Sequence, residues 1–298
     1  MANNKVKRSK ADHLFYIIDY ILLALLSVVI LVPIINVIAQ SVSSPNMVVG
    51  GRVFLLPKEF SVQAYRSLLK NSAIVTGYLN TLIYMVSGTL INLVMTVICA
   101  YPLARRELVG RNAVMAIFTF TMLFNGGMIP NYMLMKDLHL LDTRWVMIIP
   151  GAISVWNMIM ARTFFQTSIP STLYESANLD GAGDFRVLWS IVLPLSKPII
   201  AVLSLFYAVG HWNSYFNAML YLKSTKLFNI QLVLRNALND IGTMMDTTGN
   251  VTEQLNAIAA QEVSKYAMIV ITMIPVLIIY PFVQKFFVKG VMIGSIKG

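Results

Sequence analysis

The feature of this sequence that most restricts its fold is a set of six long apolar segments without a charged residue. A helix needs about 20 mostly apolar residues to cross a hydrocarbon core of roughly 30 Å, and it satisfies its own backbone hydrogen bonds there. The six segments meet or approach this length, and they are residues 20–39, 73–104, 112–135, 145–161, 198–222 and 266–284. With 57% hydrophobic and only 12% charged residues, the chain also lacks the polar material to cover a water-soluble globule. We therefore expect an all-α integral membrane protein.

Flanking residues extend these segments into six expected transmembrane helices, which make up one domain of residues 14–288. Their expected ranges are 14–40, 73–104, 111–135, 145–166, 197–222 and 265–287. The second charge-free segment has 32 residues, too few for two spans and a turn, so it predicts one long or tilted helix. The fourth has only 17 residues and reaches a full span if the Arg162 side chain snorkels to the membrane surface. An even number of spans places both termini on the same side.

The distribution of Lys and Arg predicts which side that is, because basic residues near helix ends are retained in the cytoplasm. Residues 1–13 contain one basic cluster, and Arg105, Arg106 and Arg111 form another. With these clusters inside, 13 of the 23 basic residues are cytoplasmic and 10 lie in longer outer loops. We expect both termini in the cytoplasm, with a cytoplasmic tail of residues 289–298. Since the net charge of +10 comes from membrane-flanking residues, the expected partner is the lipid bilayer and not nucleic acid.

Residues 168–196, between the fourth and fifth expected spans, form a cytoplasmic loop with a regular internal pattern. Ser168 or Ser171 can cap a helix start, and Pro170 suits the first helical turn. Glycines then interrupt this helix, and a second short apolar helix over 185–193 leads back to the membrane. The loop therefore predicts two short helices joined by a glycine turn. Such a compact element is suited to docking in a groove on a cytoplasmic partner and to transmitting its motion.

The spacing within this loop gives a more specific signal. Its key residues are, in order, Glu175, Ser176, Ala177, Gly181, Ile191, Leu193 and Pro194. This pattern resembles the Glu-Ala-Ala signature of the permease subunits of bacterial binding-protein-dependent, ATP-driven (ABC) importers. Only Ser176 departs from it, as one small residue in place of another. The six expected spans, the basic N-terminus and the short tail also resemble the second permease subunit of maltose-type sugar importers, so the resemblance covers nearly the whole chain.

The resemblance implies a role and a set of partners. In the family, this loop forms coupling helices that sit in a cleft of a separate ATPase subunit, and the C-terminal tail reaches between the ATPase subunits. The implied ATPase-coupling residues are Glu175, Ser176, Ala177, Asp180, Gly181, Ala182, Ile191, Leu193 and Pro194, and the implied tail contacts are Gly294, Ser295 and Lys297. The implied partners are two cytoplasmic ATPase subunits, a second homologous permease and an extracytoplasmic sugar-binding protein, all at the cytoplasmic membrane of a bacterium.

Several chemical functions have no visible basis in the sequence. No phosphate-binding Gly-x-x-x-x-Gly-Lys-Ser/Thr loop occurs, so ATP and Mg²⁺ are expected on the partner ATPase and no cofactor is expected on this chain. The three histidines stand apart and the single cysteine lies in an apolar segment, so we expect no metal site. Motifs for a nucleophile with its base are also absent. The chain is therefore expected not to be an enzyme.

Several amide and aromatic side chains lie inside the expected spans, where a polar group is costly unless it is paired or lines an aqueous route. These candidates for the sugar route are Asn80, Asn92, Asn157, Trp212, Asn213, Tyr215 and Asn217. Amides suit sugar hydroxyls, and aromatic faces suit sugar rings. The alternative is that each amide bonds to a neighbouring helix, and for any single residue that alternative has the greater weight. The cluster over 212–217 is the strongest candidate.

Residues 124–130 and 206–222 resemble permeases that import oligosaccharides released from complex or acidic polysaccharides. The expected function is therefore the permease subunit of an ATP-driven oligosaccharide importer, which forms half of the translocation pathway and couples to the ATPase through residues 175–194. The alternative from another class is a secondary transporter driven by an ion gradient. Such a transporter would place an acidic residue near the middle of the membrane, whereas Asp19, near the start of the first span, is the only Asp or Glu in the six expected spans.

Overall fold

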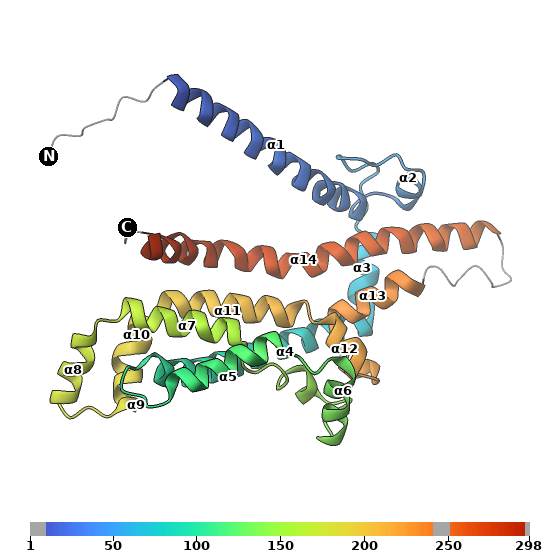
Figure 1. Ribbon diagram of the computed structural model, residues 1–298. Helices are drawn as coiled ribbons and strands as arrows, with labels where there is room; N and C mark the ends of the chain where they lie inside the picture. The colour runs from blue at the N-terminus through green and yellow to red at the C-terminus, as the bar shows by residue number, and fades with distance from the viewer. Residues whose placement is uncertain (1–9, 241–250, 296–298) are drawn as a thin grey trace. The chain divides into compact units, whose positions relative to one another are not determined.

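The computed structural model of the protein describes residues 10–240 and 251–295, and every regular element in these ranges is a helix (Figure 1). The expected all-α fold is therefore confirmed for the described residues. The chain divides into two compact units. Unit 1 comprises Met1–Lys70 with Ala237–Ile271, and unit 2 comprises Asn71–Asn236 with Thr272–Gly298.

Unit 1 is built on a long apolar helix. Its helices are α1 (Lys10–Ser41), α2 (Pro45–Val49), α3 (Gln63–Lys70) and the first part of α14 (Val251–Ser295). The most apolar stretch of α1 is entirely exposed within this chain, as expected for a helix whose solvent is lipid. Near the end of α1, Ala39 packs with Val48 and with Val263 of α14. Tyr65 holds this small core in place, because its hydroxyl lies 2.7 Å from Ser41 Oγ as a hydrogen-bond donor.

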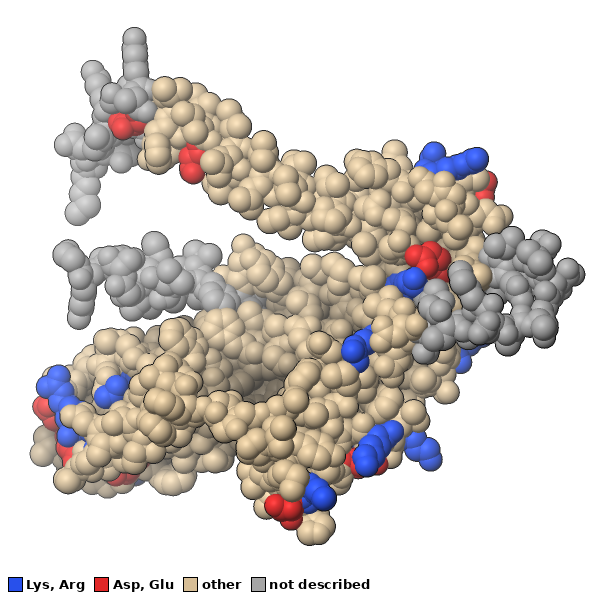
Figure 2. Space-filling model, turned by 45° about the vertical axis from the view of Figure 1, so that its right-hand side comes forward, with Lys and Arg blue, Asp and Glu red and all other residues tan. Residues whose placement is uncertain are grey.

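Unit 2 is centred on α4, which packs against α7 and α11. Its longer helices are α4 (Ser72–Ala104), α5 (Arg111–Leu123), α7 (Val155–Ser168) and α11 (Lys197–Trp212). Its shorter ones are α6 (Met128–Asp137), η1 (Arg144–Met147), α8 (Ser171–Leu179), α9 (Asp184–Val187), η2 (Leu188–Val192), α10 (Leu193–Leu195), α12 (Tyr215–Tyr221), η3 (Thr225–Leu227) and α13 (Ile230–Asp240), whose last residues belong to unit 1. Figure 2 shows charged side chains gathered toward the ends of unit 2, with an uncharged zone between them, as membrane insertion requires.

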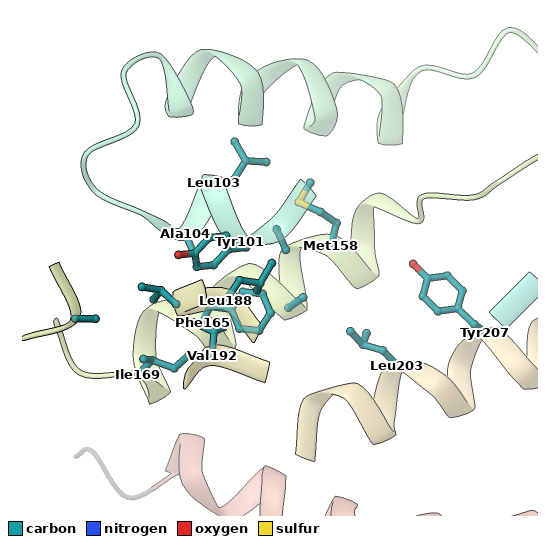
Figure 3. Packing of buried hydrophobic residues seen from close by; sticks show 14 residues of the cluster. Tyr101, Leu103, Ala104, Met158, Phe165, Ile169, Leu188, Val192, Leu203 and Tyr207 are labelled. Atoms are coloured by element: carbon teal, nitrogen blue, oxygen red, sulfur yellow. The ribbon is translucent and has the colours of Figure 1, made fainter. Parts of the chain in front are cut away.

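Two hydrophobic cores hold unit 2 together. The first joins the end of α4 to α7, α11 and the loop of residues 168–196 through Tyr101, Phe165, Val192 and Leu203 (Figure 3). The second lies nearer the start of α4, where Tyr84 packs with residues of η1, α12 and α13. The predicted coupling residues therefore lie near one end of α4, and the strongest part of the predicted sugar route lies near its other end.

Three helices among the described residues are long and apolar enough to cross a membrane, namely α1, α4 and α14. They contain the expected spans 14–40, 73–104 and 265–287. Two bent helix pairs raise the number to at most five if each pair is one span. The α5–α6 pair is bent by 111°, and α9–α10 is bent by 82° from α11. Six continuous spans are not present in the described residues.

The third expected span, 111–135, is wrong as a single straight helix. Helix α5 ends at Leu123 and the chain turns before α6. At this turn Gly127 has a φ of +91°, a backbone conformation that glycine adopts without strain. The Gly127 N–H donates to Asn125 Oδ1 over 2.9 Å. Local turn chemistry thus outweighs the length of the charge-free segment.

The fourth expected span, 145–166, is also wrong as a continuous helix. Its first part is the short 3₁₀ helix η1, and α7 begins only at Val155. Between them, Pro150 has no N–H to continue a helix and Gly151 has a φ of +75°. The chain therefore enters α7 through a turn.

The fifth expected span, 197–222, is broken once. Helix α11 ends at Trp212, and α12 begins at Tyr215. At the break, Ser214 Oγ donates a hydrogen bond to the carbonyl of His211 over 2.7 Å. In a continuous helix, this carbonyl would accept a hydrogen bond from a backbone N–H.

The predicted basic N-terminus and tail are only partly within the described residues. Residues 1–9 and Lys297 lie outside them. Gly294 and Ser295 form the last described turn of α14. The cytoplasmic location of both termini stays a prediction.

Candidate functional site

The loop between α7 and α11 contains a helix, a glycine turn and a second helix, as the sequence predicts. We call residues 171–195, from α8 through α10, the 171–195 segment. Helix α8 ends in a Schellman motif, in which the Ala182 N–H donates to the carbonyl of Ala177 over 2.9 Å and the Gly181 N–H donates to that of Asn178 over 3.0 Å. Gly181 has the left-handed φ of +73° that this motif requires. The spacing from Ala177 to Gly181 and Ala182 is therefore the spacing of a helix C-terminus.

The start of α8 differs from the prediction. Pro170 occupies the N-cap position, and neither Ser168 nor Ser171 caps the helix with its side chain. The proline ring fixes φ near −60°, so the helix begins there without a hydroxyl cap. Ser176, the one departure from the family pattern, donates its hydroxyl to the carbonyl of Thr172 over 2.9 Å. This residue therefore satisfies its hydroxyl within its own helix.

One side of the 171–195 segment faces the first core of unit 2. Ala177 is only 6% exposed and packs with the buried Val187 and Val192. Ile191 and Leu193 are partly buried against the same core. These motif positions therefore attach the segment to α4, α7 and α11.

The other side of the segment is exposed and includes both charged and large apolar side chains. Glu175, Asp180 and Pro194 lie on the surface, as the sequence analysis expected of contact residues. Three large side chains that the sequence analysis missed are also exposed, namely Leu179 at 90%, Phe185 at 83% and Trp189 at 72%. The spacing of Phe185 and Trp189, four residues apart, could have revealed them as one helix face. Large exposed apolar side chains outside the expected spans are typical of a surface that another subunit or the membrane covers.

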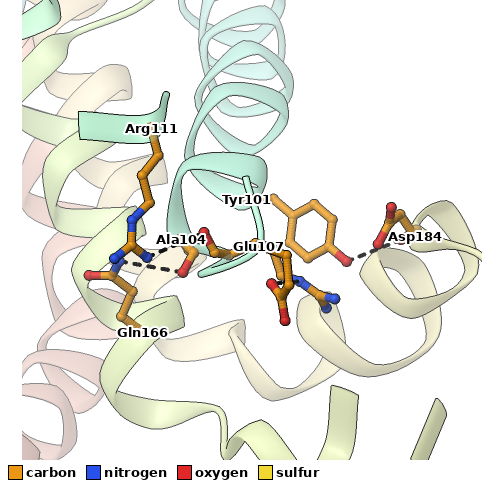
Figure 4. A network of polar contacts seen from close by, with 7 residues as sticks. Tyr101, Ala104, Glu107, Arg111, Gln166 and Asp184 are labelled. Atoms are coloured by element: carbon orange, nitrogen blue, oxygen red, sulfur yellow. Dashed lines mark hydrogen bonds and ion pairs between the residues drawn. The ribbon is translucent and has the colours of Figure 1, made fainter. Parts of the chain in front are cut away.

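A group of polar contacts joins the end of α4 to the 171–195 segment (Figure 4). The Arg105 guanidinium lies 4.3 Å from the centre of the Tyr174 ring, and Arg105 Nε lies 3.2 Å from Glu107 Oε2. Tyr101 donates its hydroxyl to the carbonyl of Asp184 over 3.3 Å. Burial raises the pKa of Tyr174. The pKa of Glu107 is lowered by a hydrogen bond from the backbone N–H of Glu107 itself and by the nearby Arg105. Beside these contacts lies a cavity of about 460 Å³, lined in part by Phe185.

The carbonyl groups at the end of α4, which have no partner within the helix, are satisfied by side chains from α5 and α7. Arg162 Nε donates to the Leu103 carbonyl over 2.9 Å, and Gln166 Nε2 donates to the Ala104 carbonyl over 3.4 Å. The Arg111 guanidinium donates to the next carbonyl, that of Arg105. Arg162, expected to snorkel toward the membrane surface, is therefore a helix cap, and the end of α4 is firmly joined to α7.

The predicted sugar-route residues fall into two groups, of which the first is buried and bonded within unit 2. Asn80 Nδ2 donates to the carbonyls of Lys226 and Phe228 over 2.8 and 3.1 Å. Trp212 Nε1 donates to the carbonyl of Thr272 over 3.1 Å. Asn157 is also buried, in the first turn of α7. For Asn80 and Trp212 the structure favours the alternative role of bonding to neighbouring segments.

Asn92 belongs to the same buried group and has two partners. Its Nδ2 donates to the carbonyl of Gly151 over 2.8 Å, and its Oδ1 lies 2.7 Å from His211 Nε2. A Cβ atom on Gly88 would lie 2.3 Å from that imidazole nitrogen, so the glycine is what lets His211 reach Asn92. This cluster holds the turn before α7 and the end of α11 against α4.

The second group is exposed. Asn213, Tyr215 and Asn217 lie on the surface around the break between α11 and α12, while Ala218 and Tyr221 of α12 face the second core. These three residues are free to meet a sugar or a second subunit. The predicted cluster over 212–217 thus divides into the buried Trp212 and an exposed remainder.

Comparisons with known proteins agree with this arrangement. The family described as "Binding-protein-dependent transport system inner membrane component" matches residues 1–293. The polygalacturonan/rhamnogalacturonan transport system permease protein YtcP of Bacillus subtilis (strain 168) is 41% identical over 288 residues, which are 96% of this chain and 99% of that protein. Protein LplC of the same organism is 39% identical over 290 residues, 97% of each chain.

A solved structure is similar along the same length. It is described as the crystal structure of a bacterial ABC transporter involved in the import of the acidic polysaccharide alginate. One of its chains matches with a TM-score of 0.84 and 36% identity, and the match covers 95% of this chain and 100% of that one. The chain described here therefore belongs to the family of binding-protein-dependent transport system inner membrane components.

Proposed function

We propose that this chain is the membrane-spanning permease subunit of an ATP-driven oligosaccharide importer and that it forms half of the translocation pathway. Its family and the transport function named for its relatives support this role. The second half would come from a homologous permease, two cytoplasmic ATPase subunits would bind and hydrolyse ATP with Mg²⁺, and an extracytoplasmic binding protein would deliver the sugar. The chain itself would catalyse no reaction. Family membership does not favour the alternative of a transporter driven by an ion gradient.

The observation that supports ATPase coupling best is the two-sided 171–195 segment. Leu179, Phe185 and Trp189 are exposed on a short element whose other side is packed into the bundle core. A partner that grips the exposed side would move a rigid element joined to α4 through Arg105 and Tyr174. ATP-driven closure of the ATPase dimer would thereby rock the helices between inward-facing and outward-facing states. Glu175 and Asp180 would offer carboxylates to basic groups of the ATPase.

The proposed topology has both termini in the cytoplasm and six crossings within residues 14–288. Three crossings would be α1, α4 and α14. The α5–α6 pair, η1 with α7, and α11–α12 would supply the other three as broken spans, whose turns are tolerated where a second subunit or an aqueous route covers them. This topology places the 171–195 segment in the cytoplasm. It also places the tail, with Gly294, Ser295 and Lys297, within reach of the ATPase subunits.

The proposed cargo is an oligosaccharide released from an acidic polysaccharide. Polygalacturonan and alginate, named for two of the relatives, both consist of sugars with carboxylate groups. Asn213, Tyr215 and Asn217 would meet this cargo, because they are the exposed members of the predicted sugar route. The buried Asn80, Asn92 and Trp212 would keep the broken helices in place.

A Gly181→Asp substitution tests the coupling role in the complete transporter, reconstituted in vesicles with its ATPase, second permease and binding protein. A non-glycine residue at a φ of +73° costs about 1–2 kcal/mol and distorts the end of α8. We expect sugar uptake to fall at least tenfold, with ATP hydrolysis no longer stimulated by the loaded binding protein. Gly110→Asp is the matched control, since Gly110 has a φ of +80° and, like Gly181, has open space around it. Normal uptake by an assembled Gly181→Asp transporter would refute the coupling role.

A further inference from the structure

Arg235 lies beside the exposed part of the predicted sugar route, although the sequence analysis did not select it. It belongs to α13, whose residues Ile230 and Leu232 are buried, while Arg235 itself is exposed. Its guanidinium carbon lies 5.7 Å from the centre of the Tyr215 ring, and its Nη1 donates to Met219 Sδ. The packing of α13 therefore brings a permanent positive charge against α12.

The surroundings of Arg235 combine three chemical features that suit a charged sugar. The Tyr215 ring is 42% exposed and stands edge to face with Phe216 at a centroid distance of 6.3 Å, so it offers an apolar face. Asn213 and Asn217 offer amide donors and acceptors nearby on the chain. Among the described residues, no carboxylate forms an ion pair with Arg235. Its N–H groups therefore remain able to bind an external carboxylate in the bidentate manner typical of arginine.

The position of α13 along α4 indicates that Arg235 faces water. The Ile230 N–H donates to Thr81 Oγ1 over 2.8 Å, which fixes the start of α13 to α4. The 33-residue α4 is about 50 Å long and so exceeds a hydrocarbon core of roughly 30 Å. Thr81 lies about 14 Å from the start of α4, near one boundary of the core if the helix is centred. Arg235 lies five residues after Ile230 along α13 and is exposed. A guanidinium near the core is costly against lipid and is stable where it faces an aqueous route.

We propose that Arg235 is a specificity-determining residue that binds the carboxylate of a uronate sugar as the oligosaccharide passes the α11–α12 break. The Tyr215 ring would pack against the apolar face of the same or the next sugar ring. This inference rests on the proposed function, and it assigns recognition of the negative charge to one side chain of this permease in addition to the binding protein.

The test uses the complete transporter in vesicles, with trigalacturonate and a trisaccharide of mannuronate as probes. Arg235→Gln removes the charge and keeps an amide, and Arg235→Lys keeps the charge but not the bidentate geometry. We expect initial uptake of at least one probe to fall at least tenfold in Arg235→Gln and less in Arg235→Lys. ATP hydrolysis stimulated by the loaded binding protein should stay within twofold of wild type, because the residue is remote from the 171–195 segment. Lys226→Gln is the matched control, since Lys226 is an exposed cation of the same unit.

The possible outcomes separate this inference from the proposed function. If the wild-type transporter takes up an acidic probe and Arg235→Gln does so at the same rate, the role of Arg235 is refuted. An equal loss in Lys226→Gln would also refute it, because the effect would then be one of general surface charge. If the assembled wild type takes up neither acidic probe but takes up the carboxyl-reduced, neutral trisaccharide, the carboxylate-binding role fails while the importer function stands. Failure with every oligosaccharide would refute the proposed function itself.

Discussion

At one end of unit 2 the 171–195 segment exposes Leu179, Phe185 and Trp189, whereas α4 buries Asn80 and Asn92 along its length. Both regions reverse the usual distribution, in which large apolar side chains are buried and amides are exposed. The buried amides are satisfied within the chain, because Asn80 donates to carbonyls at the end of η3 and Asn92 donates to the carbonyl of Gly151 in the turn before α7. The exposed aromatic side chains have no such partner within the described part of their own unit. The difference separates side chains that hold the broken helices together from side chains that stay exposed in this chain.

The largest effect that can test this distinction is expected at Trp189. Buried aromatic side chains at the centre of an interface are typical hot spots, and their truncation costs about 2 kcal/mol or more. Trp189→Ala should therefore weaken binding of the ATPase to the solubilised permease pair by about 30-fold. The thermal stability of the permease should stay nearly unchanged, because this side chain is 72% exposed.

Val109→Ala is the control for this measurement. Val109 is 95% exposed and lies in the loop between α4 and α5, outside the 171–195 segment. Its truncation should leave ATPase binding within about twofold of wild type. Equal affinities for Trp189→Ala and wild type would mean that the exposed aromatic surface contacts something other than the ATPase, such as lipid.

The 171–195 segment was largely predictable because its pattern is local. The Schellman motif links Ala177, Gly181 and Ala182 within six consecutive residues, so its spacing is readable from the chain. The absence of a hydroxyl cap at Pro170 was missed, since several adjacent residues could begin the helix. The exposure of Phe185 and Trp189 was missed because their spacing places them on one helix face but does not show whether that face is covered.

A smaller effect is expected at Asn92, which is one of the buried amides. Asn92→Leu removes the donor to the Gly151 carbonyl and the partner of the half-buried His211 imidazole. We expect a loss of about 1–2 kcal/mol in the free energy of unfolding, since hydrogen bonds between membrane helices are worth less than an isolated buried bond suggests. Thermal unfolding of the detergent-solubilised complex measures this loss.

Asn217→Leu provides the comparison, because Asn217 is exposed on α12 and has no bond in the described structure that the leucine would break. Its unfolding should match wild type within about 0.5 kcal/mol. A larger loss in Asn217→Leu than in Asn92→Leu would show that the buried and exposed groups have been assigned the wrong way round.

The bonds of the buried amides could not be predicted from the sequence, because they join residues far apart in the chain. Asn80 and the Lys226 carbonyl are separated by 146 residues, and Asn92 and His211 by 119. The breaks within the expected spans could not be predicted for the same reason. Three of the charge-free segments lie within the long helices α1, α4 and α14, but charge-free length could not show that Gly127, Gly151 and Ser214 lie at turns. Residue type indicated which side chains are costly in a membrane, and only the fold showed how each is satisfied.

The smallest effect is expected at Asp142, which forms a third kind of site where a charged group outside the spans joins two loops. Its Oδ1 accepts hydrogen bonds from the backbone N–H groups of Lys223 and Ser224 over 2.9 and 2.8 Å, and its Oδ2 accepts one from Ser224 Oγ. The bonds from Ser224, followed by that from Lys223, lower the pKa of Asp142 below its ordinary value of 3.8. A carboxylate with a lowered pKa stabilises the folded state above its unfolded-state pKa, and the benefit disappears as the pH falls through the folded-state value.

Asp142→Asn should therefore lower the unfolding temperature slightly at pH 7 and have almost no effect near pH 2. We expect a difference below about 1 kcal/mol at pH 7, because the carboxylate is solvent-accessible and its interactions are screened. Asp137→Asn is a suitable control, since Asp137 lies nearby in the sequence, at the end of α6. If Asp142→Asn loses the same stability at pH 2 as at pH 7, its contribution comes from the shape of the turn and not from the charge. A loss of stability at pH 7 but not at pH 2 would instead show that the ionised carboxylate of Asp142 holds the two loops together. The buried amides, by contrast, hold the helices together as neutral groups.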